Sequence, residues 1–526
     1  MIILFEDEHL LVINKPAGMN THAPSPYAGE GIYDWLRHRE PRWANLAIIH
    51  RLDKQTSGVM VFGKTSAANR SLTEQFAEHK AEKIYLLATD RPIKKQAFTA
   101  RSALVRTGDK YLSRPVHAGA DVAETRFKFL RGENERNFVE ARPITGRTHQ
   151  IRVHAAEHGF PIVGDDVYGG SPAARLWLHA AELSLQHPGT GQRTIFRAPA
   201  NFQADVGFAL REAVIDRAQT NAYRLVHGAS DQHPGWYVDR LDKFLLSQSE
   251  QELTAQQREQ LAKLMVLTEA RGVYHKRLTR HVRQTKLDDV SPQPVLGQWA
   301  SGPFFVRENR VQYELNFDEG YSVGLFLDQR DNRRRLLVKH VAAGFPFLSA
   351  PGEWEVLNTF AYTCGFSVCA ALSGARTTSL DLSKKYLEWG KRNFALNALD
   401  PARHDFIYGD AFDWMARMAK KQRRFNAILL DPPTFSQSKQ SGVFRVEKDY
   451  ASLVKLALPL LKNGGTLLAS TNSASWPADQ FVRLITSTIA KTKHRVLQMH
   501  YVPQPPDFPV SRAEPAYLKT IWLRID

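Results

Sequence analysis

The chain has 526 residues, and its composition narrows the classes of protein it can belong to. Seventy Lys and Arg against fifty-four Asp and Glu give a formal net charge of +16, which favours a polyanionic partner such as a nucleic acid. The length predicts about two to four domains. No run of about 20 apolar residues occurs and the first residues lack a basic signal segment, so we expect neither a membrane span nor export. Only two cysteines are present, which argues against a disulfide framework and indicates a reducing, cytoplasmic location.

The first 200 residues have the pattern of a mostly antiparallel sheet. Residues 1–8 are expected to begin it, and short apolar runs at 10–13 and 83–87 alternate with Gly/Pro turns. Between these runs lies the polar cluster His50–Ser57, in which Asp53 is flanked by cations. A neighbouring cation keeps a carboxylate ionised, and an ionised carboxylate can act as nucleophile or base. The alternative interpretation is a surface turn rich in salt bridges.

Further motifs surround this cluster in a fixed order: Asn14–Gly18 before it, then Glu82–Tyr85, Thr145–His154 and Pro161–Asp165. Over roughly residues 1 to 200, the series resembles the RluA family of pseudouridine synthases. The resemblance implies that Asp53 drives detachment of uracil, rotation of the base and re-attachment through carbon 5, without a cofactor or metal.

The same resemblance implies roles for three other residues. Tyr85 matches the ring that packs on the target uracil and assists removal of its C5 proton. Arg152 matches a guanidinium that pairs with the aspartate in a bidentate geometry. Arg51 matches the side chain that props open the RNA when the uridine is flipped out of its stack.

The character of the sequence changes near residue 200, where 197–203 has little periodicity and forms a plausible domain edge. Residues 220–240 are predicted as a helix followed by a strand. One interpretation is that they are ordinary scaffold. The other is that they form a small central domain, because their sequence resembles that domain of RlmI-type and RlmK-type rRNA methyltransferases. A helix is expected between 251 and 268. Residues 271–286 carry eight basic residues, histidines included, and form either an RNA-facing stripe or a solvated basic face.

From residue 321 the pattern becomes Rossmann-like. A strand is predicted at 354–360, and a small-residue turn at the start of a helix follows it, which is where a nucleotide-like ligand docks. A second strand ends in Asp381, whose carboxylate suits a ribose diol, and Ser383 is expected to cap a helix over 384–396.

A third strand is expected to end at Gly409-Asp410, where the carboxylate can meet an adenine edge, and a fourth runs into Asp431-Pro432-Pro433-Thr434-Phe435. The spacing of these four positions resembles a class I S-adenosylmethionine-dependent methyltransferase, and the glycines of an NAD fingerprint are missing. The residues predicted to bind S-adenosylmethionine are Phe360, Tyr362, Thr363, Gly365, Asp381, Asp410, Asp431 and Arg330.

The methylated atom can be predicted from the catalytic groups that each candidate reaction requires. Residues 386–393 and 431–439 resemble RlmK, whose family methylates guanine N7, whereas 327–331 and the central domain also fit RlmI, which makes 5-methylcytosine. Carbon methylation needs a cysteine thiolate that adds to cytosine C6. RlmI-type enzymes place it in the loop that here reads Ser470-Thr471-Asn472-Ser473. Guanine N7 is therefore favoured, and an exocyclic amine, giving N2-methylguanine, stays open.

The sequence thus predicts a bifunctional RNA modification enzyme with a multidomain α/β and α+β fold. We expect a mainly antiparallel synthase domain at 1–205, a small α+β central domain at 206–320 and a Rossmann-like methyltransferase domain at 321–526. The expected substrate is 23S ribosomal RNA, with transfer RNA as the alternative. From another class, the chain could be an RNA-binding assembly factor whose methyltransferase half is inactive.

Overall fold

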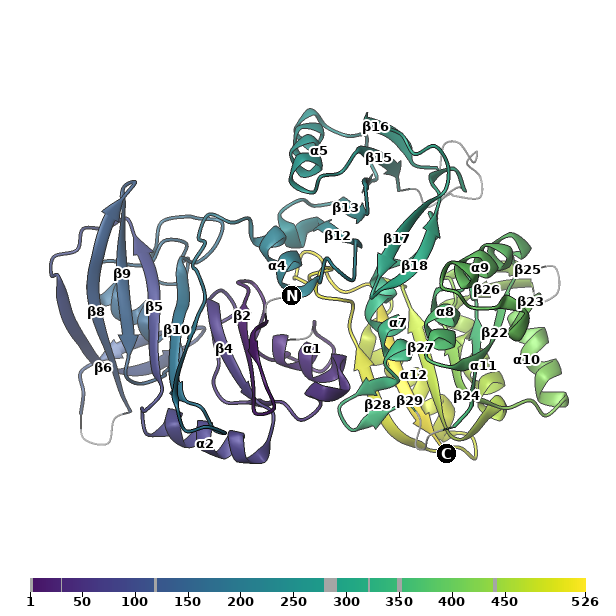
Figure 1. Ribbon diagram of the computed structural model, residues 1–526, viewed down its shortest axis with the longest axis horizontal. Coiled ribbons are helices and arrows are strands. Elements are labelled where there is room, and N and C mark those ends of the chain that lie inside the picture. Colours follow the sequence, from purple (N-terminus) through teal and green to yellow (C-terminus); the bar gives the residue numbers. More distant parts are fainter. Residues whose placement is uncertain are drawn as a thin grey trace. The chain divides into compact units, whose positions relative to one another are not determined.

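The computed structural model describes residues 3–29, 31–117, 121–278, 291–319, 322–347, 352–438 and 442–526 (Figure 1). The chain forms two compact units. The first comprises Met1–Pro24, Glu30–Leu36 and Asn45–Val214, and the second comprises Ser25–Gly29, Arg37–Ala44 and Ile215–Asp526. The three-domain division at residues 205 and 320 stays a prediction.

The first unit is built on one sheet that, in the described part of the chain, has eleven strands ordered β1-β2-β4-β10-β5-β9-β8-β6-β7, with β3 and β11 on side branches. Every pair is antiparallel except β4 with β10, which confirms the predicted mainly antiparallel sheet. The strands are β1 (Ile3–Glu6), β2 (Leu10–Lys15), β3 (Ala47–Ile48), β4 (Ser57–Gly63), β5 (Glu82–Thr89), β6 (Ala97–Thr107), β7 (Lys110–Arg114), β8 (Val122–Glu133), β9 (Arg136–Pro143), β10 (Leu178–Gln186) and β11 (Arg193–Arg197). The helices of this stretch are α1 (Ile32–Arg39), α2 (Ser66–Ala77), α3 (Gln150–Glu157) and α4 (Val206–Val214).

The second unit begins with a five-stranded central sheet, in order β12-β13-β14-β15-β16. Its elements are β12 (Ala222–His227), β13 (Trp236–Leu241), β14 (Phe244–Ser249), α5 (Ala255–Leu267), β15 (Gly272–Arg277) and β16 (Gln293–Gly297). The parallel pair β14 and β15 requires a crossover, and α5 supplies it, starting at a capping box between Thr254 and Gln257. The prediction of a helix at the start of this region is wrong, because β12 is a strand with nearly all its side chains buried. Such short apolar runs do not distinguish strand from helix.

The predicted basic stripe at 271–286 is placed only in part. Residues 279–286 lie outside the described residues. Within β15, His275 and Lys276 are buried and Arg277 is exposed, as is Arg271 just before the strand. The described part of the segment therefore does not present a continuous basic face.

A hairpin of β17 (Phe304–Glu308) and β18 (Val311–Leu315) precedes the second sheet of this unit, which has the strand order β23-β22-β21-β24-β27-β29-β28. All its pairs are parallel except those of β29, as in the predicted Rossmann-like methyltransferase domain. The strands are β21 (Trp354–Thr359), β22 (Ala375–Asp381), β23 (Asp405–Tyr408), β24 (Phe425–Leu430), β27 (Leu461–Thr471), β28 (Val496–Val502) and β29 (Lys519–Ile525), beside small hairpins of β19 (His340–Ala342) with β20 (Phe345–Pro346) and β25 (Phe435–Ser438) with β26 (Gly442–Arg445). The helices are α7 (Arg330–Leu337), α8 (Gly365–Leu372), α9 (Lys384–Leu396), α10 (Ala411–Lys420), α11 (Val446–Ala457) and α12 (Ala478–Ala490).

Alternating residues of this sheet feed two separate cores. Val356 and Leu429 join one cluster with apolar residues of α7, α8 and α9, whereas Leu357 and Ile428 join another with residues of α10, α11 and α12. Both faces of the sheet are thus covered by helices (Figure 1). The chain leaves β21 in one direction through β22 and returns to β24 on its other side, so the topological switch point lies between β21 and β24. Among the described residues, no helix is both long and apolar enough to cross a membrane.

Candidate active sites

The four residues predicted to act on uridine line one cavity of the first unit, with a volume of about 1160 Å³. Asp53 lies in the loop before β4, Tyr85 lies in β5, and Arg152 lies in the first turn of α3. Arg51 is exposed, two residues before Asp53. The structure therefore brings together residues that are separated by up to 101 positions in the sequence.

The predicted bidentate pair between Arg152 and Asp53 is not formed. Arg152 Nη1 lies 4.0 Å from Asp53 Oδ2, and the Asp53 side chain is 28% exposed. The guanidinium instead donates from Nε and Nη2 to both oxygens of Asp165, at 2.8 and 2.7 Å. Asp165 is fully buried, and a buried carboxylate needs a partner with good geometry more than a half-exposed one does. Asp165 thus orients Arg152, a role that its Gly-Asp motif did not reveal.

The Asn-Lys-Pro motif at residues 14–16 stabilises the loop that carries Asp53. Lys15 is fully buried, and its Nζ donates to the carbonyls of Pro16, Met19 and Lys54 at 2.9, 2.6 and 3.2 Å. Burial lowers the pKa of Lys15 to about 7, although the nearby Asp53 charge opposes this shift. The sequence analysis recognised the Asn14–Gly18 motif as part of the family pattern. It did not predict that Lys15 contacts the carbonyl of Lys54, the residue after Asp53.

Tyr85 is held as a neutral phenol. Burial, and then the negative charge of Asp53, raise its pKa well above the ordinary value. A phenol that keeps its proton is a weak base, so this environment suits a ring that packs on the uracil better than one that removes a proton.

Seven of the eight predicted cofactor positions lie at or just after the carboxyl ends of parallel strands in the second unit, and the eighth, Arg330, lies in α7. Phe360, Tyr362 and Cys364 follow β21, and all three have left-handed backbone, with φ of 57°, 48° and 63°. Side chains other than glycine rarely adopt this conformation, and when they do it is often at a functional turn. The single glycine of the turn, Gly365, begins α8.

Asp381 organises this turn. One oxygen accepts the Tyr362 N–H at 2.8 Å and the other accepts the Ser383 N–H at 2.8 Å. Burial raises the pKa of Asp381. Ser383 caps α9, whose bounds are those predicted, by accepting the Tyr386 N–H at 3.2 Å.

The other predicted cofactor residues are engaged in different ways. Thr363 is buried and donates to the carbonyl of Gly324 at 2.6 Å. Asp410 caps α10 by accepting the N–H groups of Phe412 and Asp413 at 2.9 and 3.3 Å.

Asp431, at the end of β24, lies at the switch point. It is half-buried and accepts from Gln329 Nε2 at 3.0 Å. Burial, with the Asp328 carboxylate as a second cause, raises its pKa to about 7.

The structure gives Arg330 a different contact from the predicted one. Its side chain is 2% exposed and donates to both oxygens of Asp507, at 2.8 and 2.5 Å. A guanidinium enclosed in this way has no surface to offer a ligand, so its buried pair with Asp507 is structural.

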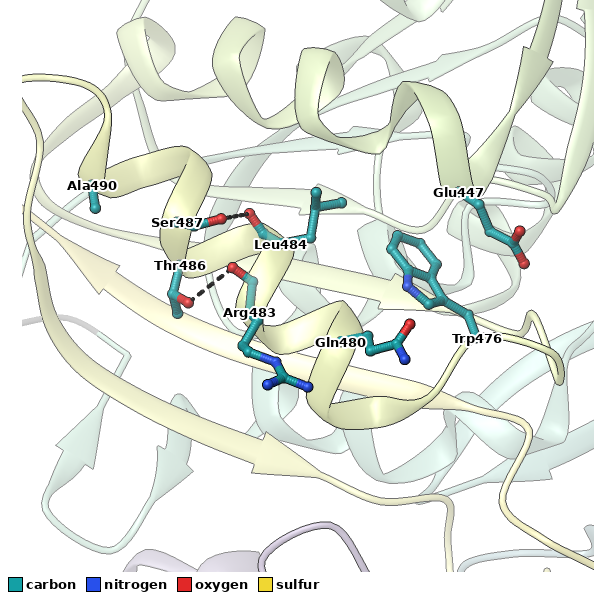
Figure 2. Close-up of a pocket in the computed structure, with 8 residues that line it drawn as sticks. All are labelled: Glu447, Trp476, Gln480, Arg483, Leu484, Thr486, Ser487 and Ala490. Carbon is teal, nitrogen blue, oxygen red and sulfur yellow. Dashed lines mark hydrogen bonds between the residues drawn. The ribbon is translucent and has the colours of Figure 1, made fainter.

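A further groove of about 950 Å³ runs along α12, and Figure 2 shows its lining. Thr486 and Ser487 donate to the carbonyls of Arg483 and Leu484 within the helix, at 3.3 and 3.1 Å. None of the predicted site residues lines this groove. Its hydroxyl groups at Thr486 and Ser487 are already used by the helix.

Comparisons with known proteins match both halves of the chain. The RNA pseudouridylate synthase family profile matches residues 9–157, and the S-adenosylmethionine-dependent methyltransferase profile matches residues 239–524. The ribosomal large subunit pseudouridine synthase C of Salmonella typhi is 38% identical over 217 residues, which cover 38% of this chain and 67% of that protein. A ribosomal RNA large subunit methyltransferase of Deinococcus radiodurans is 31% identical over 315 residues, which cover 58% of this chain and 73% of that protein.

The chain belongs to both families. The protein is therefore an enzyme that joins a pseudouridine synthase to an S-adenosylmethionine-dependent methyltransferase, and both resemblances seen in the sequence are confirmed. The crystal structure of SMU.776 complexed with SAH is also similar, with 29% identity, a TM-score of 0.51 and coverage of 65% of this chain and 86% of that one. The enzyme spans about two thirds of the length of its synthase relative.

Proposed function

We propose that the enzyme converts a uridine to pseudouridine and methylates a guanine at N7, both in large-subunit ribosomal RNA. The choice of RNA is supported by its relatives, which carry large-subunit names in both halves. In the synthase half, we assign Asp53 as the catalytic group, Tyr85 as the stacking ring, and Arg152 and Arg51 as the residues that position the reactants.

The single observation that carries the choice of methylated atom is the state of the two cysteines. Cys364 is fully enclosed and Cys369 is 2% exposed. Burial raises the pKa of each thiol to about 12. Neither thiol can supply the thiolate that carbon methylation needs, and residues 470–473 contain no cysteine. The two buried thiols therefore disfavour 5-methylcytosine and favour a nitrogen nucleophile.

Guanine N7 carries an accessible lone pair, so the enzyme needs only to position it in line with the methyl group and to exclude water. For S-adenosylmethionine itself we assign Phe360, Tyr362, Thr363, Gly365, Asp381, Asp410 and Asp431. The chemistry that the bound donor supplies is a transferable methyl group.

The decisive experiment maps both modifications on ribosomal RNA from a strain that lacks the gene, before and after treatment with the purified enzyme. We expect one new pseudouridine and one new 7-methylguanosine by nucleoside mass spectrometry. A new 5-methylcytosine or N2-methylguanosine would contradict the assignment of the methylated atom.

A further inference from the structure

Lys83 is a half-buried cation of the first unit, and it lies on β5 two residues before Tyr85. Side chains two residues apart in a strand point to the same face, and both of these line the cavity that holds Asp53. Glu82 points to the other face, where it pairs with Arg193 at 2.7 Å. The acid next to Lys83 in the sequence therefore does not neutralise it.

The Lys83 ammonium lies beside open space. Its Nζ is 5.9 Å from the centre of the Phe76 ring, and a Cβ atom added to Gly146 would lie 3.8 Å from it. Apart from the chain neighbours of Gly146, no other atom would lie within 4 Å of that Cβ atom. Within the part of the chain that the structure describes, Lys83 forms no hydrogen bond and no ion pair.

This environment is unfavourable for a charged group. An ammonium that loses part of its hydration without gaining an anion is destabilised, and a nearby aromatic ring offsets only part of that cost. Burial accordingly lowers the pKa of Lys83. The other Lys and Arg side chains that line the cavity are either exposed or already bound to a carboxylate: Arg51, Lys54, Arg147 and Arg152. A negatively charged ligand would therefore be bound more favourably at Lys83 than a neutral one.

The RNA itself carries such an anion. Uracil is neutral, so its carbonyl oxygens cannot neutralise an ammonium, whereas every phosphodiester carries a negative charge. Tyr85, to which we assign stacking on the uracil, is about 7 Å from Lys83 along the strand, at about 3.4 Å per residue. An anion bound by Lys83 therefore lies beyond the edge of the stacked base, where the backbone of the same nucleotide extends.

We propose that Lys83 is a positioning residue of the pseudouridine synthase and that its ammonium binds a phosphodiester next to the target uridine. The inference rests on the proposed function, in which a uridine of RNA is the substrate. Lys83 then holds the nucleotide by its backbone while Tyr85 holds the base, so that Asp53 meets a uridine fixed at two points. Because the ion pair forms before the reaction and persists through it, its loss acts on KM more than on kcat.

The test compares full-length Lys83→Met with the unmodified enzyme on ribosomal RNA from a strain that lacks the gene. Methionine keeps an apolar stem and removes the charge. We expect KM for pseudouridine formation to rise tenfold or more at low salt, with little change in kcat, since a hydrogen bond to a charged group is worth that much. The plot of log kcat/KM against log salt concentration should lose about 0.7 of its slope, the share of one phosphate on a single strand.

Two variants and one stability measurement are the controls. Lys83→Arg keeps the charge and should keep the salt slope. Lys128→Met removes an equal charge from the opposite face of the sheet, because Lys128 lies opposite Glu140 and Glu140 lies opposite Leu86, so it should change neither KM nor the slope. Lys83 makes no hydrogen bond that methionine would break, so the thermal transition of Lys83→Met should be no lower than that of the unmodified enzyme.

Methylphosphonate linkages, which are neutral, locate the phosphate. Once the target uridine has been mapped, synthetic RNA with one such linkage on the 5′ or the 3′ side of it is compared with unmodified RNA. We expect one of the two to raise KM tenfold or more for the unmodified enzyme and to have no further effect on Lys83→Met, because both changes remove the same ion pair. Additive effects would mean that Lys83 binds another group, such as a uracil carbonyl, and would overturn the inference.

The outcomes separate this inference from the proposed function. Unchanged KM and salt slope in Lys83→Met, or only a lower thermal transition, would overturn the inference and leave the proposed function standing. If no Lys83 variant folds, the methylphosphonate RNAs decide with the unmodified enzyme, and an unchanged KM for both would overturn the inference. If the unmodified enzyme forms no pseudouridine in the RNA, both fall, because the anion assigned to Lys83 arrives with the target uridine.

Discussion

The protonation of Asp431 makes methyl transfer dependent on pH in a direction that can be worked out. The pKa of this acid is about 7, raised first by burial and then by the Asp328 carboxylate. Its protonated form dominates below pH 7 and its ionised form above. If the protonated form, besides its assigned part in binding S-adenosylmethionine, also donates to the O6 of the target guanine, kcat/KM for RNA follows the protonated fraction and falls about tenfold between pH 6 and pH 8.

Other charged groups face this acid and define the controls. Arg333 on α7 lowers the pKa of Asp431, while the buried Tyr450 on α11 lies close enough that Asp431 helps to raise the pKa of the phenol. Arg224 and Asp239 act on Asp328 from the central sheet. Asp328→Asn removes the like charge that helps to raise this pKa, so the midpoint of the profile should move to lower pH.

Asp431→Asn is the sharper perturbation, because its amide donates at every pH. We expect this variant to keep methyl transfer at pH 8 and to lose the alkaline decline. The assay is transfer of labelled methyl groups to RNA at subsaturating concentration between pH 5.5 and 8.5, with pseudouridine formation by the same samples as internal control. A rate that rises between pH 6 and pH 8 would refute the reasoning, because it is the behaviour of an ionised carboxylate that accepts from an exocyclic amine.

Four further outcomes follow from the contacts described. Asp53→Asn should abolish pseudouridine formation and leave methyl transfer intact, and retained pseudouridylation would remove its assignment. Asp381→Ala should weaken S-adenosylmethionine binding by about 1.5 to 3 kcal/mol, or tenfold or more, and calorimetry showing unchanged affinity would mean that the site is misplaced. A double variant, Cys364→Ala with Cys369→Ser, should still yield 7-methylguanosine, whereas loss of methylation in a folded, cofactor-binding variant would point to thiol chemistry. Asp165→Asn strands the buried Arg152 guanidinium, so it should destabilise the first unit by about 3 kcal/mol and slow pseudouridine formation, and an unchanged calorimetric transition would contradict that pairing.

Local sequence signals were sufficient where a single element decides the structure. The helix after Ser383 has the bounds that its capping residue predicted, and the acids at the ends of β22 and β24 lie at one edge of the sheet because the strands are parallel. The confirmed fold class follows from the same patterns. The short strand β12 was mistaken for a helix because its apolar run is buried on both faces and has no distinct period.

Local sequence signals did not predict the contacts between segments that are distant in the chain. The partner of Arg152 depends on which carboxylate is more deeply buried, and that is a property of the folded sheet and its turns. The left-handed backbone at Phe360, Tyr362 and Cys364 could not be predicted, because none of these residues is a glycine, the residue that usually indicates this conformation. It is stabilised by tertiary contacts such as the Tyr362 N–H with the Asp381 carboxylate.

Arg330 shows how the central sheet is attached to the core of the methyltransferase. Asp507, fully buried in the loop between β28 and β29, accepts from Arg330 on α7 and, at 3.0 Å, from the Arg224 N–H on β12. Farther along this loop, Glu514 accepts the Ala229 N–H and the Tyr237 hydroxyl, each at 2.8 Å.

These contacts fix the central sheet to the core of the methyltransferase through buried, charge-assisted hydrogen bonds, which are among the stronger polar contacts in proteins. Tyr517, at the end of the same loop, then orients Asp328. The family profile agrees with this view, since it begins at residue 239 inside β13 and continues to residue 524 without treating the central sheet as a separate module. The loop that holds the central sheet in place therefore also contacts Asp328, two residues after Phe326, whose ring centroid lies 5.2 Å from that of Tyr362 in the cofactor turn. Changes in the central sheet should therefore alter methyl transfer.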